Sequence, residues 1–209
     1  MATKHRAIAA ASAAFAERGV AATSLDGLAA ELGVTKQTIL YHFGSKDGLV
    51  AEVLATGARE LTEALAAAVE PADDGWERVV AVVRASFALA VRRPDLVGLL
   101  REVNRLGPPW SETAVEMLQP LVDRAVEFLD RGMAAGRFRP GDPQMVLLSS
   151  YAVVTGVVSD AEVLRAVGLD LDLRVAARLR RTLLSFLEAV LVGQAGGLGQ
   201  GTLAGGVDR

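Results

Sequence analysis

The sequence contains no cysteine, which excludes disulfide bonds, thiolate metal sites and cysteine nucleophiles. Histidine is scarce as well: His5 and His42 are the only two, and both lie in the first quarter of the chain. No phosphate-binding glycine loop, nucleophile elbow or metal-ligand cluster accompanies them. We therefore expect a protein that is no enzyme and that holds neither a metal nor an organic cofactor.

A long uncharged run is also missing. An uncharged run between Asp142 and Asp160 contains Ser149, Ser150 and Thr155 and is short for a bilayer span of about 20 residues. The first residues of the chain lack the apolar core of a signal peptide. We expect a cytoplasmic protein with no part in the membrane.

Charge is modest in amount and slightly uneven in distribution. The 209 residues carry a net charge of −3, with 51% hydrophobic and 22% charged residues, a balance typical of a folded chain. Residues 1–50 carry five basic and four acidic side chains, so this segment is weakly positive within an acidic protein. Any surface that binds nucleic acid is therefore expected to be local and modest.

Helical periodicity runs through nearly the whole chain, with glycine and proline between the periodic segments. Thr23 followed by Asp26 resembles a capping box at the start of the second helix, and Ser45 suits the N-cap of the fourth. The first helix is predicted to stop at Gly19. The later ones are predicted at about 25–32, 35–43, 45–69, 75–92, 95–106, 110–135, 143–167 and 171–193.

This pattern predicts an all-α protein built from two domains. Residues 1–48 are expected to form a three-helix domain with a helix-turn-helix, and residues 49–193 a larger helical bundle. Residues 194–209 are rich in glycine and are expected to form a flexible tail, because they can bury little apolar surface.

The helix-turn-helix is predicted where two short helices meet across a turn that contains Gly33. The second of these helices has one apolar face, and its other face carries an amide, a cation and an aromatic ring. A glutamine can pair with adenine and a lysine with guanine in the major groove. The residues expected to face inward are Val34, Ile39 and Phe43, and those expected to face outward are Lys36, Gln37, Leu40 and Tyr41.

Four stretches at fixed spacings carry a resemblance to a known family. They are Phe15-Ala-Glu-Arg-Gly19, Thr23-Ser24, Leu28-Ala-Ala-Glu-Leu-Gly-Val34 and Thr38-Ile-Leu-Tyr-His-Phe-Gly-Ser-Lys46 leading into Leu49. Together they make the segment from Arg6 to Leu54 resemble the DNA-binding domain of TetR-family transcriptional regulators. The rest of the chain agrees with that family in length and helical content.

The resemblance implies which side chains meet DNA. Lys36 and Gln37 would lie near base edges, and Lys46 would meet a phosphate, a role that the free N–H groups at a helix start also favour. The family commonly has tyrosine where this chain has Leu40, so that side chain is expected to touch a thymine methyl instead. The complete set of expected DNA contacts is Thr35, Lys36, Gln37, Thr38, Leu40, Tyr41, His42 and Lys46.

Each of these residues also has an ordinary structural explanation. His42 taken alone is more often a satisfied histidine, Lys46 alone is a solvated charge, and Tyr41 could cap the core of the small domain. The functional interpretation is preferred because all three fall on one predicted face.

The last two long helices are expected to form a dimer interface, as the family makes its four-helix bundle there. A stripe of small residues on one helix would let another helix approach closely, and the other helix carries a largely apolar face. The expected interface residues are Ser149, Ala152, Gly156, Leu179, Leu183, Phe186 and Val190. The alternative is that both helices contribute only to the core of a single chain.

The remaining helices are expected to enclose an apolar effector with few polar anchors. The candidate wall residues are Phe87, Leu99, Leu100, Val103, Asn104, Trp110, Met117, Leu121, Phe128 and Tyr151, although each taken singly is more often a core residue. We predict a homodimeric repressor that a small apolar effector releases from a palindromic operator in double-stranded DNA, with the helix over 45–69 as the lever. The alternative is a DNA-binding regulator without a small-molecule effector.

Overall fold

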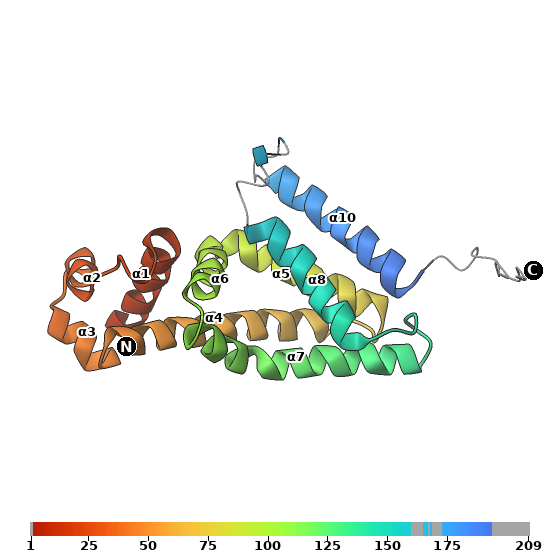
Figure 1. Ribbon diagram of the computed structural model, residues 1–209, viewed down its shortest axis with the longest axis horizontal. Helices are drawn as coiled ribbons and strands as arrows, with labels where there is room; N and C mark the ends of the chain where they lie inside the picture. Colours follow the sequence, from red (N-terminus) through yellow and green to blue (C-terminus); the bar gives the residue numbers. More distant parts are fainter. Residues whose placement is uncertain (1, 160–164, 167, 169–172, 194–209) are drawn as a thin grey trace, which may run out of the picture.

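The computed structural model describes residues 2–159, 165–166, 168 and 173–193, and within these ranges the regular secondary structure is α-helical throughout (Figure 1). The predicted all-α fold class is therefore confirmed. In chain order the helices are α1 Ala2–Arg18, α2 Leu25–Leu32, α3 Lys36–Phe43, α4 Lys46–Val69, α5 Trp76–Arg92, α6 Pro94–Leu106, α7 Trp110–Ala134, α8 Pro143–Ser159 and α10 Leu173–Leu191. The predicted tail over 194–209 lies outside the described residues, as does most of the expected extension of α8 to residue 167.

Side-chain caps fix the starts of the short N-terminal helices. The hydroxyl oxygens of Ser24, Thr35 and Ser45 each accept a hydrogen bond from the backbone N–H three residues later. The predicted cap at Ser45 is confirmed, but the predicted capping box at Thr23 is wrong by one residue. Thr23 is buried, and its hydroxyl donates to the carbonyl oxygen of Gly19 at 2.8 Å, so it closes the preceding turn instead.

The three N-terminal helices pack around an apolar core that also takes in the first turns of α4. Fully buried members include Ala11, Phe15, Ile39 and Leu49. The same cluster continues into Leu99 and Val103 of α6 and is flanked by Leu106, Trp110, Ala114 and Met117. The N-terminal helices therefore share their core with α6 and α7.

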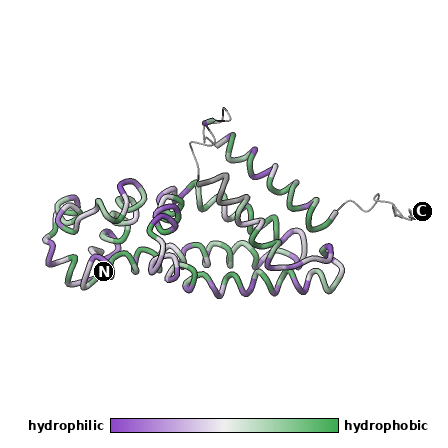
Figure 2. The backbone as a smooth tube through the Cα atoms, in the orientation of Figure 1, coloured by the Kyte–Doolittle hydropathy of each residue, from purple (hydrophilic) through white to green (hydrophobic). Residues whose placement is uncertain are grey.

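The larger part of the molecule is a bundle in which α4, α5 and α7 run side by side and α8 and α10 lie across one side (Figure 1). Two further apolar clusters hold it together. One joins Val83 and Phe87 of α5 to Leu183 and Leu187 of α10, and the other joins Leu129, Phe138 and Leu191. Figure 2 shows hydrophobic residues alternating with polar ones along α10, as expected for a helix with one buried face.

Helix α6 approaches α1 unusually closely. A Cβ atom on Gly98 would lie 2.6 Å from the Cβ of Ala16 and 3.2 Å from its carbonyl oxygen. Because these neighbours include backbone, the contact leaves room for hydrogen only. Gly98 therefore sets the distance between the N-terminal helices and the bundle.

A comparison of two helical glycines tests this spacing. Gly98→Ala and Gly57→Ala gain the same helix propensity, about 1 kcal/mol. The alanine at position 98 also meets Ala16, whereas at position 57 the nearest atom is the flexible end of Leu96 at 3.0 Å. We expect Gly98→Ala to be less stable than Gly57→Ala by about 1–3 kcal/mol in urea unfolding, the usual cost of overpacking. Equal stabilities would show that α1 and α6 are not in close contact.

Candidate functional site

Helix α3 presents a polar face to solvent and is anchored by its other face. Ile39 is 2% exposed in the shared core, and Phe43 packs against the same cluster. On the outer side Lys36 and Gln37 are exposed, and Tyr41 is 86% exposed. A tyrosine ring this exposed gains little from burial within its own chain, so its surface is available for contact with a partner.

The remaining predicted α3 residues divide between structure and surface. Leu40 is half-buried against the core, so the prediction that it projects fully outward is wrong, and less of it remains for a thymine methyl. The Thr35 hydroxyl caps α3 and lies 3.0 Å from that of Thr38. The His42 ring stands edge-on to the Tyr41 and Phe43 rings, with centroids 5.3 and 6.1 Å away.

The cations near this face differ in how they are neutralised. Lys36 forms an ion pair with Asp26 of α2, with Nζ and Oδ2 2.8 Å apart, and Arg18 pairs with Glu31 of α2 at 2.9 Å. Lys46, at the start of α4, instead donates to the carbonyl oxygen of Ala21 at 3.4 Å. Its charge therefore adds to the positive end of the α4 dipole, which favours an anion at this point.

A buried carboxylate joins the N-terminal helices to α6. Glu102 is 7% exposed, and its Oε1 accepts a hydrogen bond from the backbone N–H of Val20 at 2.6 Å. Arg105 donates to both carboxylate oxygens at 2.7 and 2.8 Å. The hydrogen bonds from Arg105, and then the one from Val20, lower the pKa of Glu102 against the opposing effect of its burial.

A second polar network lies about two turns earlier on the same helix. Ser12 of α1, which is 1% exposed, donates to Asp95 at 2.6 Å, and Asp95 also receives two hydrogen bonds from Arg93. Arg93 pairs in addition with Glu60 of α4. The hydrogen bonds from Arg93 lower the pKa of Asp95. Helices α1, α4 and α6 are therefore tied together by charged groups that are individually satisfied.

A cavity of about 260 Å³ lies among α4, α5, α6 and α7, with one residue of α8 at its wall. Its described lining residues are Leu54, Gly57, Ala58, Leu61, Ser86, Phe87, Leu89, Ala90, Leu96, Val97, Leu99, Leu100, Val103, Ala114, Leu118 and Tyr151. The structure thus brings together Phe87, Leu99, Leu100, Val103 and Tyr151 of the residues predicted from sequence.

The other predicted wall residues lie elsewhere. Trp110 and Met117 pack against the shared N-terminal core, and Phe128 stacks edge-on against Phe138 near the end of α7. Asn104 is exposed on α6, and Leu121 is half-buried on α7 outside the described cavity wall. The cause is helical phase, because α7 turns Ala114 and Leu118 toward the cavity and its larger side chains away from it.

The sequence analysis expected α4 to help enclose the pocket but named none of its residues as cavity wall. Leu54, Ala58 and Leu61 are spaced four and three residues apart, which places them on one face of a helix. This spacing is the feature of the sequence from which the α4 wall of the cavity could have been predicted.

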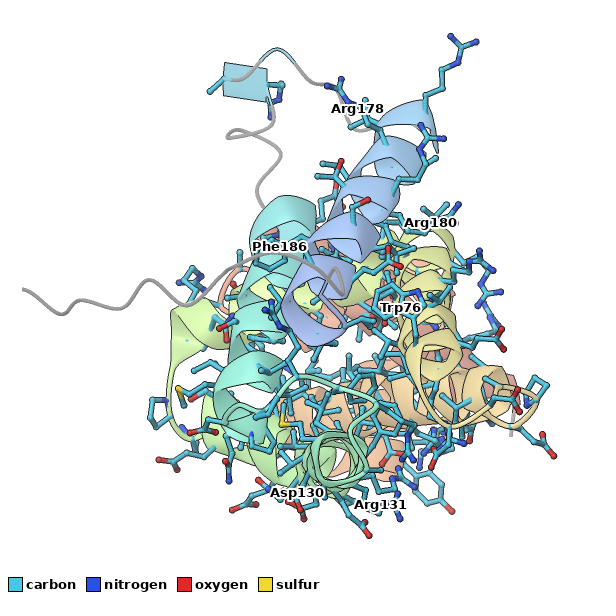
Figure 3. The ribbon with its side chains drawn as sticks, turned by 90° about the vertical axis from the view of Figure 1, so that its right-hand side faces the viewer. Trp76, Asp130, Arg131, Arg178, Arg180 and Phe186 are labelled. Carbon is cyan, nitrogen blue, oxygen red and sulfur yellow. The ribbon has the colours of Figure 1, made fainter. Side chains whose placement is uncertain are left out.

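Helices α8 and α10 lie side by side and leave apolar side chains exposed (Figure 3). Phe186 is 47% exposed and Val190 41%, and Ser149 and Ala152 on α8 are exposed too. Met145 and Leu148 of α8, which were not among the predicted interface residues, are 54% and 57% exposed.

Two predicted interface residues face the other way. Leu183 is 4% exposed and packs against Val83 and Phe87 of α5, and Leu179 packs against the same cluster. Placing Leu183 at the interface was therefore wrong, because the buried stripe of α10 is the one that faces α5. Gly156 lies in α8, but its surroundings are outside the described part of the structure.

The described residues offer neither a metal site nor a membrane-spanning helix. They contain no group of three or more histidine, cysteine or acidic side chains arranged to hold a metal ion. No helix among them has the length and hydropathy needed to cross a membrane.

Comparison with known proteins agrees with the geometry of the N-terminal helices. Residues 7–53 match the model of the bacterial regulatory proteins of the tetR family. The chain is 31% identical over 134 residues to the HTH-type transcriptional regulatory protein RaaS of Mycobacterium tuberculosis, a match that covers 63% of this chain and 58% of RaaS. It is 30% identical over 128 residues to the HTH-type transcriptional repressor KstR2 of Mycolicibacterium smegmatis, covering 60% and 62% of the two chains. The chain thus matches less than two thirds of the length of these relatives.

The fold as a whole also has solved counterparts. The structure of AibR in complex with isovaleryl coenzyme A and operator DNA superimposes with a TM-score of 0.73 at 19% identity, covering 88% of this chain and 97% of AibR. At that identity the likeness concerns the fold alone. The family and the curated relatives are transcriptional regulators and not enzymes.

The Glu102 contact predicts a specific pH dependence. Because the folded pKa of Glu102 is lowered from its ordinary value of 4.5, its stabilising contribution is fully present above pH 4.5 and is lost as the pH falls through the folded value. We expect the free energy of unfolding of Glu102→Gln, which cannot titrate, to fall less steeply below pH 4.5 than that of the wild type. The exposed Glu116→Gln is the control and should keep the wild-type slope. Identical slopes for the wild type and Glu102→Gln would contradict this role.

Proposed function

We propose that this chain is a transcriptional regulator of the TetR type that binds double-stranded DNA through α3, because residues 7–53 match the model of the bacterial regulatory proteins of the tetR family. The observation that carries the proposal is the outer face of α3, where Lys36, Gln37 and Tyr41 are exposed on a helix held rigidly by Ile39. A short, well-anchored helix with such a face fits the major groove. Residues 1–48 serve as the DNA-binding domain and residues 49–193 as the regulatory domain.

Recognition divides between base edges and phosphates. Gln37 and Lys36 read bases, and Lys36 exchanges its ion pair with Asp26 for an acceptor on the DNA. Lys46 and the N-terminal turn of α4 bind a phosphate. The remaining contacts to the backbone or groove wall come from Thr35, Thr38, Leu40, Tyr41 and His42.

Dimerisation supplies the second half of the site. The exposed apolar faces of α8 and α10 pair with those of a second copy through Ser149, Ala152, Gly156, Phe186 and Val190, with Met145 and Leu148 beside them. Two copies related by a two-fold axis then present two α3 helices to a palindromic operator.

The cavity is the site of a small apolar effector that controls DNA binding. Leu100 and Val103 of α6 line the cavity, while Gly98 and Glu102 of the same helix contact α1 and the turn after it. A ligand that displaces α6 or the adjoining part of α4 changes the separation of the two α3 helices. A coupling of about 1–3 kcal/mol would change operator affinity 5- to 150-fold. One of the relatives is named a transcriptional repressor, which supports repression as the direction of regulation here.

The DNA contacts are tested by two substitutions with different expected signatures. Gln37→Ala should cost about 1–3 kcal/mol on one base pair per half-site and relax the preference there. Lys46→Ala should weaken binding to all sequences alike and reduce the slope of log K against log salt by about 0.9 per lost phosphate contact. Fluorescence anisotropy with operator variants at several salt concentrations measures both. Arg59→Ala, on the later part of α4, is the control. If log K falls with log salt at the same slope for Lys46→Ala as for Arg59→Ala, Lys46 does not contact a phosphate.

The dimer is tested by placing a charge on the exposed face. Phe186→Asp should bury an unpaired carboxylate between two copies and shift the protein to monomers, with operator affinity falling because both half-sites must be held together. Val115→Asp, on α7 where Val115 is 60% exposed, is the matched control and should remain dimeric. Sedimentation velocity at micromolar concentration measures both variants. A wild-type protein that sediments as a monomer would refute the proposed assembly.

A further inference from the structure

The walls of the cavity have a composition that restricts what can enter. The side chains from α4, α6 and α7 that the structure places there are leucine, valine and alanine, and α5 adds Phe87. Among the described lining residues, side-chain hydroxyls come from Ser86 and Tyr151, and the others offer hydrocarbon. The cavity therefore recognises its occupant by shape and apolar contact, with few polar groups available to fix its orientation.

An ionised group is poorly matched to such walls. Moving a carboxylate or an ammonium group out of water is costly unless a counter-charge or several hydrogen bonds replace the lost hydration. Five charged residues of the neighbouring turns are engaged with one another: Arg93 with Asp95 and Glu60, and Arg105 with Glu102. A neutral ligand carries no such cost.

Ser86 restricts the polar part of the ligand further. Its hydroxyl donates to the carbonyl oxygen of Val82 at 2.9 Å, one turn earlier in α5. A serine hydroxyl has one hydrogen and two lone pairs, so Ser86 keeps only the capacity to accept. A ligand group that meets Ser86 must then be a donor, such as an alcohol, because an ether or ester oxygen would find no hydrogen on that hydroxyl.

The volume restricts the size. A cavity of about 150 Å³ holds benzene, with six heavy atoms, so about 260 Å³ holds roughly ten. We propose that the cavity binds a neutral, largely aliphatic molecule of about this size that carries one hydrogen-bond donor, of which a medium-chain alcohol is the simplest form. This inference rests on the proposed function, because it names the chemistry of the effector that the regulator would sense.

The test uses four ligands of nearly equal length: 1-nonanol, methyl octyl ether, nonanoate and nonylammonium. Titration calorimetry of the full-length protein without DNA should give the tightest binding for 1-nonanol. The ether should bind about fivefold more weakly, since it cannot donate to Ser86, and both ions at least about 100-fold more weakly. Tighter binding of either ion than of 1-nonanol would overturn the proposal, and so would the absence of binding by all four.

Matched variants locate the ligand in this cavity. Ser86→Ala should remove the difference between the alcohol and the ether. Ala90→Phe should fill the space and abolish 1-nonanol binding, while Ala88→Phe, on the exposed side of α5, should leave it unchanged. Equal binding by the two phenylalanine variants would place the ligand elsewhere. Circular dichroism identifies any variant that does not fold. If a phenylalanine variant does not fold, the Ser86→Ala comparison still decides whether the ligand binds beside Ser86.

A charge introduced into the wall should reverse the preference. Leu118→Lys should favour nonanoate over 1-nonanol by about tenfold or more, because it supplies the missing counter-charge, whereas Lys at the exposed position 119, made by Gln119→Lys, should not. Operator binding is then measured in the presence of 1-nonanol. If 1-nonanol binds but does not release the DNA, the effector role is refuted and the ligand chemistry stands. If the wild-type protein binds operator DNA but prefers nonanoate to 1-nonanol, the ligand chemistry is refuted and the proposed DNA binding stands.

Discussion

The arrangement of this molecule depends on the contact between α1 and α6. Glu102 brings a charge into a nearly buried position, where only the backbone N–H of Val20 and the guanidinium of Arg105 satisfy it. Separating the helices would leave this carboxylate short of partners, which is more costly than losing an apolar contact of similar size. Gly98 permits the approach that makes the hydrogen bond possible. These contacts, together with the continuous helix α4, hold the N-terminal helices in their orientation relative to the bundle.

Helix α6 therefore has two faces with different partners. Leu96 and Leu100 line the cavity, and Asp95, Gly98 and Glu102 meet α1 or the turn that follows it. A helix is stiff along its axis, so a displacement on one face is carried to the other with little loss. The sequence-based prediction that α4 is the lever stays a prediction, and the ion pair of Arg93 with Glu60 also ties α4 to the start of α6. On the proposed function, an effector acts on both helices together.

Local signals predicted what depends on local structure. The hydroxyl of Ser45, the glycine at position 33 and the spacing of apolar residues marked helix ends that the structure confirms. Features that depend on contacts between residues far apart in the sequence were not predicted. Thr23 and Ser24 are equally able to cap α2, and only the packing of Thr23 against α1 decides between them. Leu183 lies on an apolar stripe that either a partner or α5 could cover, and the partner of Glu102 is 82 residues away along the chain.

On the proposed function, the ion pairs of α2 explain how a chain with a net charge of −3 would select its DNA site. Asp26 and Glu31 neutralise Lys36 and Arg18 in the free protein, so the exposed face of α3 has little long-range attraction for phosphate. Because non-specific binding comes almost wholly from that attraction, it should be weak. Affinity must then come from base contacts that replace the pair with Asp26, from the phosphate contact proposed for Lys46, and from holding two half-sites at once. A regulator built in this way loses most of its hold on DNA when the spacing of its two α3 helices changes, which is the property that effector control requires.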